Sequence, residues 1–466
     1  MNINLKQLTI QKARVGMEKG EFSAEDLTRA YLENIKNKNS ELNAYLNIFD
    51  DAIDEARKID EKRKRGEKLG ALAGIPVAVK DVIMVKGREV RGASKILKGH
   101  VATYDATVIK KLREAGAILL GMTNCDEFAM GASGENSAYG PTKNPLDTTT
   151  VPGGSSSGSA AAVAGDLALT ALGSETGGSV RQPAAFTGLV GLKPTYGAVS
   201  RYGLLALCSS FDQIAPFGKT VADAEVVFNV IKGHDPLDST SLDPNLTPNT
   251  HNLKPRVIGV PTDLPLEGCD SQVLENFKLQ IEKLRSLGYV IKEISLSNLK
   301  YAIPVYYIIL PAEASANLAR YDGMRYGAHM SGANLLEDYV KTKGVGFGKE
   351  VRRRIILGTY VLSAGYYDAY YYQAMRVREL MKQDFVRAFE QVDAIVTPTT
   401  AGPAFKLDTK SKRSPIEMYL EDIFTAPANI VGVPAVSLPP GLQIISNHSR
   451  EDILFEIGKK FTGEGI

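Results

Sequence analysis

Residues 153–184 read GGSSSGSAAAVAGDLALTALGSETGGSVRQPA, and they place Ser155 and Ser179 24 positions apart, each directly after two glycines. Glycines let the backbone approach a reacting atom closely and aim several N–H groups at one point. Acyl transfer needs that arrangement, because its nucleophile works beside oxyanion donors. Gly/Ser-rich tracts also form linkers, but apolar segments at 160–164, 167–172 and 186–192 disfavour a linker here. The tract predicts an enzyme that cuts an amide bond with a serine.

Around this tract, short apolar runs alternate with helical patterns. Strands are predicted at 75–79, 117–121, 256–260, 289–294, 394–397, 435–438 and 442–445, and helices at 106–115 and 271–287. Alternation of this kind predicts an α/β fold in which helices cover both faces of a sheet.

The chain is predicted to form a single domain, 1–466, built from successive regions. Residues 1–66 form an N-terminal helical segment, in which Ser23 and Asp26 cap a helix. The regions that follow are a catalytic core at 74–233, a loop boundary at 234–255, a mostly helical substrate or partner region at 256–390, and C-terminal strands at 391–466 that complete the sheet. Tyrosines at 367–372 are typical of core or interface packing.

Composition narrows the classes of function. Among the 466 residues, 44% are hydrophobic and 23% charged, which excludes wholesale disorder. A net charge of +2 provides no field strong enough to hold nucleic acid by itself. Three well-separated cysteines suit a reducing compartment and do not suggest a zinc site. The first residues lack the apolar run of a signal peptide, so a cytoplasmic protein without a membrane span is expected.

A serine needs an adjacent base to act as a nucleophile at neutral pH. None of the five histidines lies near either serine in the sequence. Lysine is the remaining option, and Lys80 directly follows the strand predicted at 75–79. It could act as a base if burial lowered its pKa from about 10.4 to near 7. A lysine that ends a strand is also commonly a solvated cap, and its position alone leaves both interpretations open.

With these residues the chain resembles the amidase signature family, whose hallmark is Gly-Gly-Ser-Ser, then Gly-Gly-Ser 24 positions later, with a lysine upstream in an apolar strand. The resemblance implies the amidase signature fold, with a mixed central sheet, and a Ser–Ser–Lys triad. Ser179 is then the acylated nucleophile, Ser155 relays its proton through a hydroxyl next to a cis peptide, and Lys80 activates Ser155. The oxyanion hole consists of the backbone amides of Thr176, Gly177, Gly178 and Ser179.

The resemblance covers nearly the whole chain. Supporting motifs lie at 126–131, 140–145, 181–184, 192–197 and 365–371. Three residues depart from the family pattern: Ser157 replaces the more usual glycine, Glu175 an aspartate and Leu146 a tryptophan. None of the three departures removes a catalytic group.

Within the family, the chain is most similar to the glutamine-hydrolysing subunits of tRNA-dependent amidotransferases. L-Glutamine carries an α-carboxylate and an α-ammonium, so its pocket needs a fixed cation and a fixed anion. The resemblance implies that Arg354 holds the carboxylate, that Asp422 holds the ammonium and that Tyr306 lines the pocket. The neighbours Arg353 and Tyr307 remain open as alternatives.

This resemblance also implies a reaction and a set of partners. Ammonia released from glutamine converts Glu-tRNA(Gln) to Gln-tRNA(Gln) in an ATP-dependent heterotrimer with companion subunits B and C. The partner is expected to bind most of the Glu-tRNA(Gln), together with ATP and Mg. No cofactor and no metal are expected on this subunit.

Four alternatives compete with this interpretation. Gly154-Ser155-Ser156-Ser157-Gly158 fits the nucleophile elbow of α/β-hydrolases, with Ser156 as nucleophile, but 145–152 makes a poor preceding strand. Gly218-Lys219-Thr220 looks like the end of a P-loop, but Gln213 stands where a glycine is required. A non-catalytic module could bind an anion in the glycine-rich loops. A free-standing amidase could hydrolyse a small amide.

Overall fold

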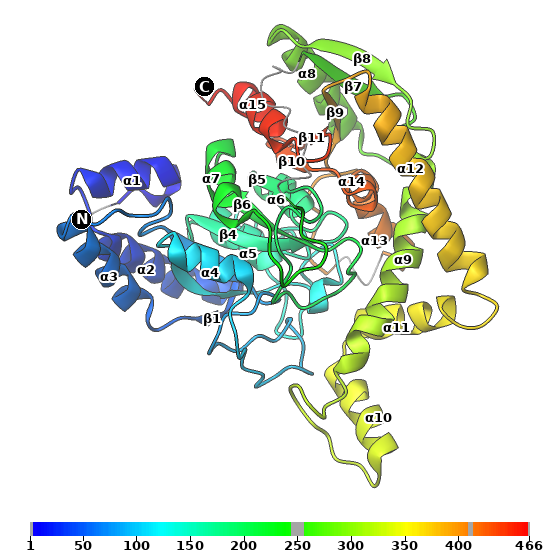
Figure 1. The fold of residues 1–466 in the computed structure, drawn as a ribbon, viewed down its shortest axis with the longest axis horizontal. Helices are drawn as coiled ribbons and strands as arrows, with labels where there is room; N and C mark the ends of the chain where they lie inside the picture. The colour runs from blue at the N-terminus through cyan, green and yellow to red at the C-terminus, as the bar shows by residue number, and fades with distance from the viewer. Residues whose placement is uncertain (1–2, 244–255, 409–412, 465–466) are drawn as a thin grey trace.

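The computed structural model describes residues 3–243, 256–408 and 413–464. In this part of the chain, eleven strands form one continuous mixed sheet (Figure 1). The strands are β1 (Tyr45–Ile48), β2 (Pro76–Lys80), β3 (Ile118–Thr123), β4 (Thr170–Glu175), β5 (Val190–Lys193), β6 (Gln213–Gly218), β7 (Val257–Pro261), β8 (Val290–Ile294), β9 (Ala394–Pro398), β10 (Ala435–Leu438) and β11 (Leu442–Ser446).

The strands follow the order β1-β3-β2-β4-β6-β5-β10-β11-β9-β7-β8. Parallel ladders join β3 to β2, β2 to β4, β9 to β7 and β7 to β8, and the other neighbours are antiparallel. Every residue of β2, β3, β4, β5 and β6 is buried. Strands buried on both faces need cover on both faces, which explains their apolar composition.

Helices supply that cover and also extend beyond the sheet. They are α1 (Ile10–Glu18), α2 (Ala24–Leu42), α3 (Ala52–Lys64), α4 (Thr107–Glu114), α5 (Ser157–Ala164), α6 (Arg181–Thr187), α7 (Val221–Ile231), α8 (Ser271–Ser286), α9 (Ala302–Asn317), α10 (Leu335–Gly346), α11 (Lys349–Val361), α12 (Gln373–Phe389), α13 (Pro415–Tyr419), α14 (Ala426–Val431) and α15 (Glu451–Thr462). Figure 1 shows α1, α2 and α3 on one side, α9, α11 and α12 on the opposite side, and α10 projecting from the body. Across the described residues, no helix combines the length and apolar character needed to span a membrane.

The predicted α/β architecture is confirmed, and the predicted strands and helices lie within a residue or two of observed ones. The Ser23 cap is also present, since its hydroxyl accepts from the Asp26 amide at 3.0 Å and the Asp26 carboxylate accepts from the Ser23 amide at 2.9 Å. Strands β4, β5 and β6 were not predicted, although they form the centre of the sheet. The N-terminal segment, expected to be helical, also contributes β1 at the edge of the sheet. Of the predicted boundary at 234–255, residues 244–255 lie outside the described residues.

The pairing of β2 with β4 positions the candidate site. The two strands are parallel neighbours, with Val79 opposite Leu172, so their carboxyl ends lie at the same edge of the sheet. Lys80 is the last residue of β2, and the loop 176–179 follows directly after β4. Ser155 and Ser156 lie just before α5, which packs against both strands. The sheet therefore brings together segments about 75 to 100 residues apart in the sequence.

Candidate active site

Lys80 is completely buried in a group of hydroxyls. Its Nζ lies 2.8 Å from Ser155 Oγ, 3.0 Å from Ser156 Oγ and 3.0 Å from Ser174 Oγ. The Ser174 carbonyl oxygen is a fourth neighbour, at 3.3 Å. The interpretation of Lys80 as a solvated strand cap is therefore wrong.

The hydrogen bonds of Ser156 limit which hydroxyl can donate a proton to the Lys80 amine. The Ser156 hydroxyl donates to the Ser174 carbonyl oxygen at 3.0 Å, so its oxygen can only accept from the lysine. A neutral amine has one lone pair and two N–H groups, and the hydroxyls left to donate to that lone pair are those of Ser155 and Ser174. Ser155 is the nearer of the two. The arrangement fits a base that takes a proton from Ser155.

The alternative of Ser156 as the nucleophile of an α/β-hydrolase elbow is excluded. Its hydroxyl is held by the lysine and by a backbone carbonyl. Residues 145–152 form turns and isolated bridges instead of the strand that such an elbow requires.

Burial lowers the pKa of Lys80 from its ordinary value to about 8. At pH 7, about a tenth of the molecules then carry the neutral amine. Because the neutral form is the one that can accept a proton, we expect kcat/KM to rise about tenfold per pH unit below pH 8 and to level off above it. The check is a pH–rate profile at constant ionic strength. A rate that falls as pH increases through 8 would contradict the role of Lys80 as base.

The loop Thr176-Gly177-Gly178-Ser179 carries the second serine, which is buried to 7% exposure. Within the described part of the chain, the amides of Gly177, Gly178 and Ser179 donate to no protein acceptor. The side chain of Thr176 is fixed by Asp212, which accepts its hydroxyl at 2.7 Å. Backbone amides with no internal partner beside a buried serine are the donors that an oxyanion requires.

A buried ion pair closes this loop at its base. Glu175 Oε2 accepts from the backbone amides of Val180 and Arg181, each at 3.0 Å, and Oε1 accepts from Arg181 Nε at 2.7 Å. Burial by itself would raise the pKa of Glu175, but Arg181 outweighs it and holds this pKa below its ordinary value. The glutamate that departs from the family pattern therefore acts as a charged clamp across residues 176–179.

The two candidate catalytic serines are joined through the backbone. The Ser156 amide donates to the Ser179 carbonyl oxygen at 3.2 Å. The Gly154–Ser155 peptide is cis, as the family resemblance implies. No hydrogen bond connects the hydroxyls of Ser155 and Ser179 within the described residues, and catalytic contacts often tighten only when substrate is bound. The structure thus supplies the Lys80–Ser155 contact directly and places Ser179 on a segment tied to the same turn.

The glycines of the loop are in close contact with two of the predicted substrate-binding residues. A Cβ on Gly177 would lie 2.4 Å from the Tyr306 hydroxyl oxygen. A Cβ on Gly178 would lie 2.3 Å from Thr425 Oγ1 and 3.2 Å from Asp422 Oδ1. Any side chain at 177 or 178 would collide with these groups, so the glycines allow the loop to approach them. Tyr306 and Asp422 therefore lie at the loop, as a substrate pocket requires.

Arg354 lines a cavity of about 140 Å³ together with Tyr307, Glu350 and Tyr419. Its side chain is 5% exposed, whereas that of Arg353 is 49% exposed. Burial opposes the charge of Arg354, but Glu350 outweighs burial and keeps the pKa of the guanidinium above its ordinary value. Burial raises the pKa of Asp422 to about 6, so this carboxyl is mostly ionised at neutral pH. The cavity is therefore lined by a fixed cation, and Tyr307, which also lines it, connects it to the fixed anion Asp422.

Several residues of the site could not be found from the sequence. Ser174 is one polar residue among many in the glycine-rich tract, yet its carbonyl and hydroxyl both contact the lysine. Glu350 and Tyr419 contact Arg354 from positions that no motif marks. Tyr307, which the sequence offers only as an alternative to Tyr306, contacts Asp422 with its hydroxyl at 2.8 Å. Contacts between distant segments are the only signal for these residues.

The supposed P-loop is absent. The segment before Lys219 is strand β6, and the Thr220 hydroxyl caps α7 by accepting from the Asp223 amide at 3.1 Å. Lys219 forms an ion pair with Asp166 at 2.5 Å. No phosphate cradle forms at these residues.

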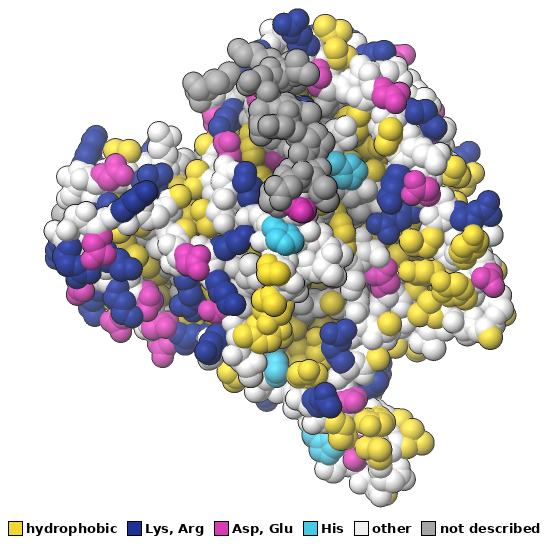
Figure 2. Space-filling model, viewed as in Figure 1, with side chains coloured by type: hydrophobic (Ala, Val, Ile, Leu, Met, Phe, Trp, Pro, Cys, Tyr) yellow, Lys and Arg dark blue, Asp and Glu magenta, His cyan; other side chains and the backbone are white. Residues whose placement is uncertain are grey.

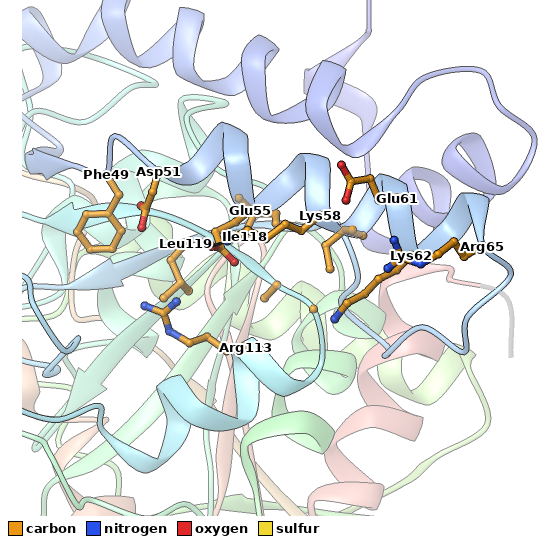
Figure 3. A pocket seen from close by; sticks show the side chains of 13 residues that line it. Phe49, Asp51, Glu55, Lys58, Glu61, Lys62, Arg65, Arg113, Ile118 and Leu119 are labelled. Carbon is orange, nitrogen blue, oxygen red and sulfur yellow. Dashed lines mark hydrogen bonds and ion pairs between the residues drawn. The ribbon is translucent and has the colours of Figure 1, made fainter.

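Another hollow, of about 280 Å³, lies between α3 and β3 (Figure 3). Its charged side chains come from α3, from the capping residues Asp51 and Arg65, and from α4. Lys58 forms an ion pair with Glu55 at 2.7 Å, and Arg113 with Asp105, outside the hollow, at 3.6 Å. None of the candidate site residues lines this hollow. We assign no chemistry to it.

Comparison with known proteins agrees with the fold. Residues 26–451 match the Amidase family, and the chain belongs to this family. The chain is 50% identical to the A subunit of glutamyl-tRNA(Gln) amidotransferase from Koribacter versatilis, over 98% of both chains. The crystal structure of the corresponding protein from Thermotoga maritima is 38% identical and superposes with a TM-score of 0.78, over 99% of this chain and 94% of that one. Peptide amidase from Stenotrophomonas maltophilia is 30% identical with a TM-score of 0.83, over 99% and 97%.

Proposed function

We propose that this chain is the glutaminase subunit of a glutamyl-tRNA(Gln) amidotransferase. In this role it hydrolyses glutamine through an acyl-enzyme and supplies the ammonia that converts Glu-tRNA(Gln) to Gln-tRNA(Gln). The observation that carries the proposal is the fixed pair Arg354 and Asp422: Asp422 lies beside Gly178 in the loop of Ser179, and Tyr307 contacts both charged groups. Full-length similarity to the A subunits of this enzyme in other organisms supports it.

The proposed proton path follows the contacts of Lys80. The neutral amine takes the proton of Ser155, and Ser155 takes the proton of Ser179 as the Ser179 oxygen attacks the amide carbon of glutamine. The amides at 176–179 hold the oxygen that becomes negative. As the tetrahedral intermediate collapses, the protons return along the same path to the leaving nitrogen, which departs as ammonia. Water then attacks the acyl-enzyme by the same path in reverse and releases glutamate.

The proposed substrate contacts explain why an amino acid amide is chosen. The Arg354 guanidinium holds the α-carboxylate, the Asp422 carboxylate holds the α-ammonium, and Tyr306 lines the pocket where it lies against Gly177. A small amide without these charges would gain nothing from either group. The fixed cation and anion therefore favour glutamine over the alternative of a free-standing amidase for simple amides.

Exposed apolar side chains support the existence of partner subunits. They lie on α10, on α11 and on the segment that leads into α12, and Figure 2 shows hydrophobic side chains gathered over the projecting α10. The set includes Leu335, Leu336, Val340, Ile356, Tyr360, Tyr366, Tyr367, Tyr370 and Tyr372. Of the two interpretations of the tyrosines at 367–372, core packing is wrong for Tyr367, Tyr370 and Tyr372, each more than 40% exposed. Surfaces of this kind mark interaction sites.

We further propose the arrangement of the complex. Companion subunits B and C complete a heterotrimer, one of them binds ATP and Mg, and Glu-tRNA(Gln) is bound mainly by the partner. A cytoplasmic location suits these substrates. The absence of a phosphate cradle at 218–220 is consistent with ATP binding elsewhere in the complex.

The test is glutamine hydrolysis by the isolated chain and by the chain co-expressed with its companion subunits. We expect weak hydrolysis from the isolated chain and a clear gain when the partners are present, because partners order the surfaces near the pocket. Mass spectrometry of the co-purified proteins identifies those partners. Rapid turnover of simple aliphatic amides by the isolated chain, with no response to partners, would favour the free-standing amidase instead.

A further inference from the structure

The structure points to a positioning role for three residues that no catalytic motif contains: Glu350, Tyr307 and Tyr419. We infer that they form a ring of contacts that connects Arg354 to Asp422 and fixes the distance between the two charges that select the substrate. The inference rests on the proposed function, because it assigns the two charges to the α-groups of glutamine. We call Glu350, Tyr307, Tyr419, Arg354 and Asp422 the charge ring.

The first part of the charge ring orients the cation. Glu350 and Arg354 are one turn apart on α11, and Glu350 Oε1 accepts from Arg354 Nε at 2.8 Å. This contact occupies one edge of the guanidinium and leaves the two terminal nitrogens for a planar carboxylate. The other oxygen of Glu350 pairs with Arg353. Glu350 is 11% exposed, and the charge of Arg354 lowers its pKa against the effect of burial.

The second part orients the anion. The Tyr307 hydroxyl donates to Asp422 Oδ2 at 2.8 Å, so that Oδ1 is the oxygen beside Gly178. Tyr307 is on α9, and Asp422 follows α13, more than 100 residues later. One carboxylate oxygen is thus held by a phenol, and the other lies toward the oxyanion loop. This geometry presents a single oxygen to an ammonium group at the pocket.

Tyr307 and Tyr419 close the charge ring. Their aromatic side chains stack with centroids 3.8 Å apart and planes 15° apart. The Tyr419 hydroxyl donates to Glu350 Oε1 at 3.2 Å, the oxygen that also holds Arg354. The Arg354 guanidinium carbon lies 5.5 Å from the Tyr307 ring centroid and 5.6 Å from that of Tyr419. The charges of Arg354 and Asp422 are therefore connected through two rigid aromatic side chains, so a shift of one charged group moves the other.

A rigid spacing selects for the length of the substrate. We therefore expect asparagine, whose α-carbon lies one methylene nearer to its amide, to be a poorer substrate than glutamine. The side chains of the charge ring need not touch the reacting amide to have this effect. They act on the binding of glutamine, and the chemistry at Ser179 remains that of the loop 176–179.

The experiment compares Tyr307→Phe, Tyr419→Phe and Glu350→Gln in the assembled complex, with Lys349→Gln as a control on the adjacent exposed position. Three substrates separate the charges: glutamine, 4-carbamoylbutanoate, which lacks the ammonium, and butanamide, which lacks both α-groups. We expect each ring variant to raise KM for glutamine about tenfold or more, since each Tyr→Phe variant loses a hydrogen bond to a carboxylate and Glu350→Gln loses the charge that orients Arg354. We expect kcat/KM for butanamide to stay unchanged in all variants.

The double variant Tyr307→Phe, Tyr419→Phe tests whether the ring acts as a unit. We expect its rise in KM to be clearly smaller than the product of the two single effects, because one break already frees both charges. Tyr307→Phe should also raise KM for 4-carbamoylbutanoate, although the lost hydrogen bond is on the ammonium side. If the two single effects on KM multiply in the double variant, the inference of a charge ring is wrong. It is also wrong if a variant lowers kcat/KM equally for glutamine and for butanamide. A lower KM in Glu350→Gln would also overturn it, because Glu350 would then compete with the substrate.

The wild-type complex separates this inference from the proposed function. If the wild-type complex hydrolyses butanamide and shows no preference for glutamine, the proposed function fails regardless of the variants. If wild-type prefers glutamine and the ring variants keep that preference, only the ring fails. Thermal unfolding of each variant, expected within a few degrees of wild type, confirms that the comparison concerns folded protein.

Discussion

Replacing Ser179 with alanine is expected to lower glutamine hydrolysis at least about ten-thousandfold, to the residual rate supported by binding and the oxyanion donors. The substitution removes the only atom that can become acylated in the proposed mechanism. The hydroxyl makes no contact that the described fold depends on, so the variant should fold normally. The measurement is ammonia release by the assembled complex under saturating glutamine.

The matched control for this prediction is Ser157→Ala. Ser157 belongs to the same tract and is also buried, and its hydroxyl donates to the Thr142 hydroxyl at 3.2 Å. We expect this variant to keep near-normal turnover. Retention of more than about a tenth of the activity in Ser179→Ala would exclude Ser179 as the nucleophile, and detection of an acyl group on it by mass spectrometry in the wild type would establish it.

Replacing Lys80 with alanine or methionine is expected to lower turnover about a hundred- to ten-thousandfold, the usual range for loss of a general base. Folding should survive, because a buried amine that is mostly protonated at pH 7 costs free energy, and its removal relieves that cost. The residual activity should no longer rise as pH increases through 8. The measurements are a pH–rate profile and thermal unfolding of each variant.

Lys193→Met is the control for this second prediction. Lys193 is also completely buried, its pKa is lowered by burial to about 7, and its Nζ donates to the Pro194 carbonyl oxygen at 2.7 Å. Lys193 is not one of the residues whose side chains surround the Lys80 amine. Its replacement should therefore leave the pH dependence of the rate as in the wild type. If Lys80→Met kept wild-type turnover, the base would have to be sought elsewhere.

Much of the fold could be predicted because most strands on either side of β4, β6 and β5 are simple apolar runs. The strand expected at 75–79 is β2, and that expected at 435–438 is β10. The central strands were missed because polar and turn-forming residues interrupt them. Strand β6 contains Pro216, which removes a backbone donor and stands opposite Leu172 in the ladder with β4, whereas the ladder with β5 reaches only Phe217 and Gly218. A single sequence does not show which edge of a strand will form hydrogen bonds with a neighbouring strand.

The candidate site could be predicted only in part, for a similar reason. Lys80, Ser155 and Ser179 stand in motifs, and the structure gathers their segments at one edge of the sheet. The partners of Lys80 and of Arg354 could not be predicted, because they depend on how distant segments pack. In the sequence Glu350 looks like any glutamate on a helix. Its contact with Tyr419 depends on the packing of α13 against α11.

The division of labour along the chain has a consequence for how such enzymes diversify. The groups proposed to break the bond lie between positions 80 and 179, whereas those proposed to hold the charges of the amino acid lie between 306 and 422. Substitutions between positions 306 and 422 can therefore change the range of amides that an enzyme accepts without changing the residues between 80 and 179. Peptide amidase, which shares the architecture at 30% identity, shows how far related chains have drifted while the common framework persisted.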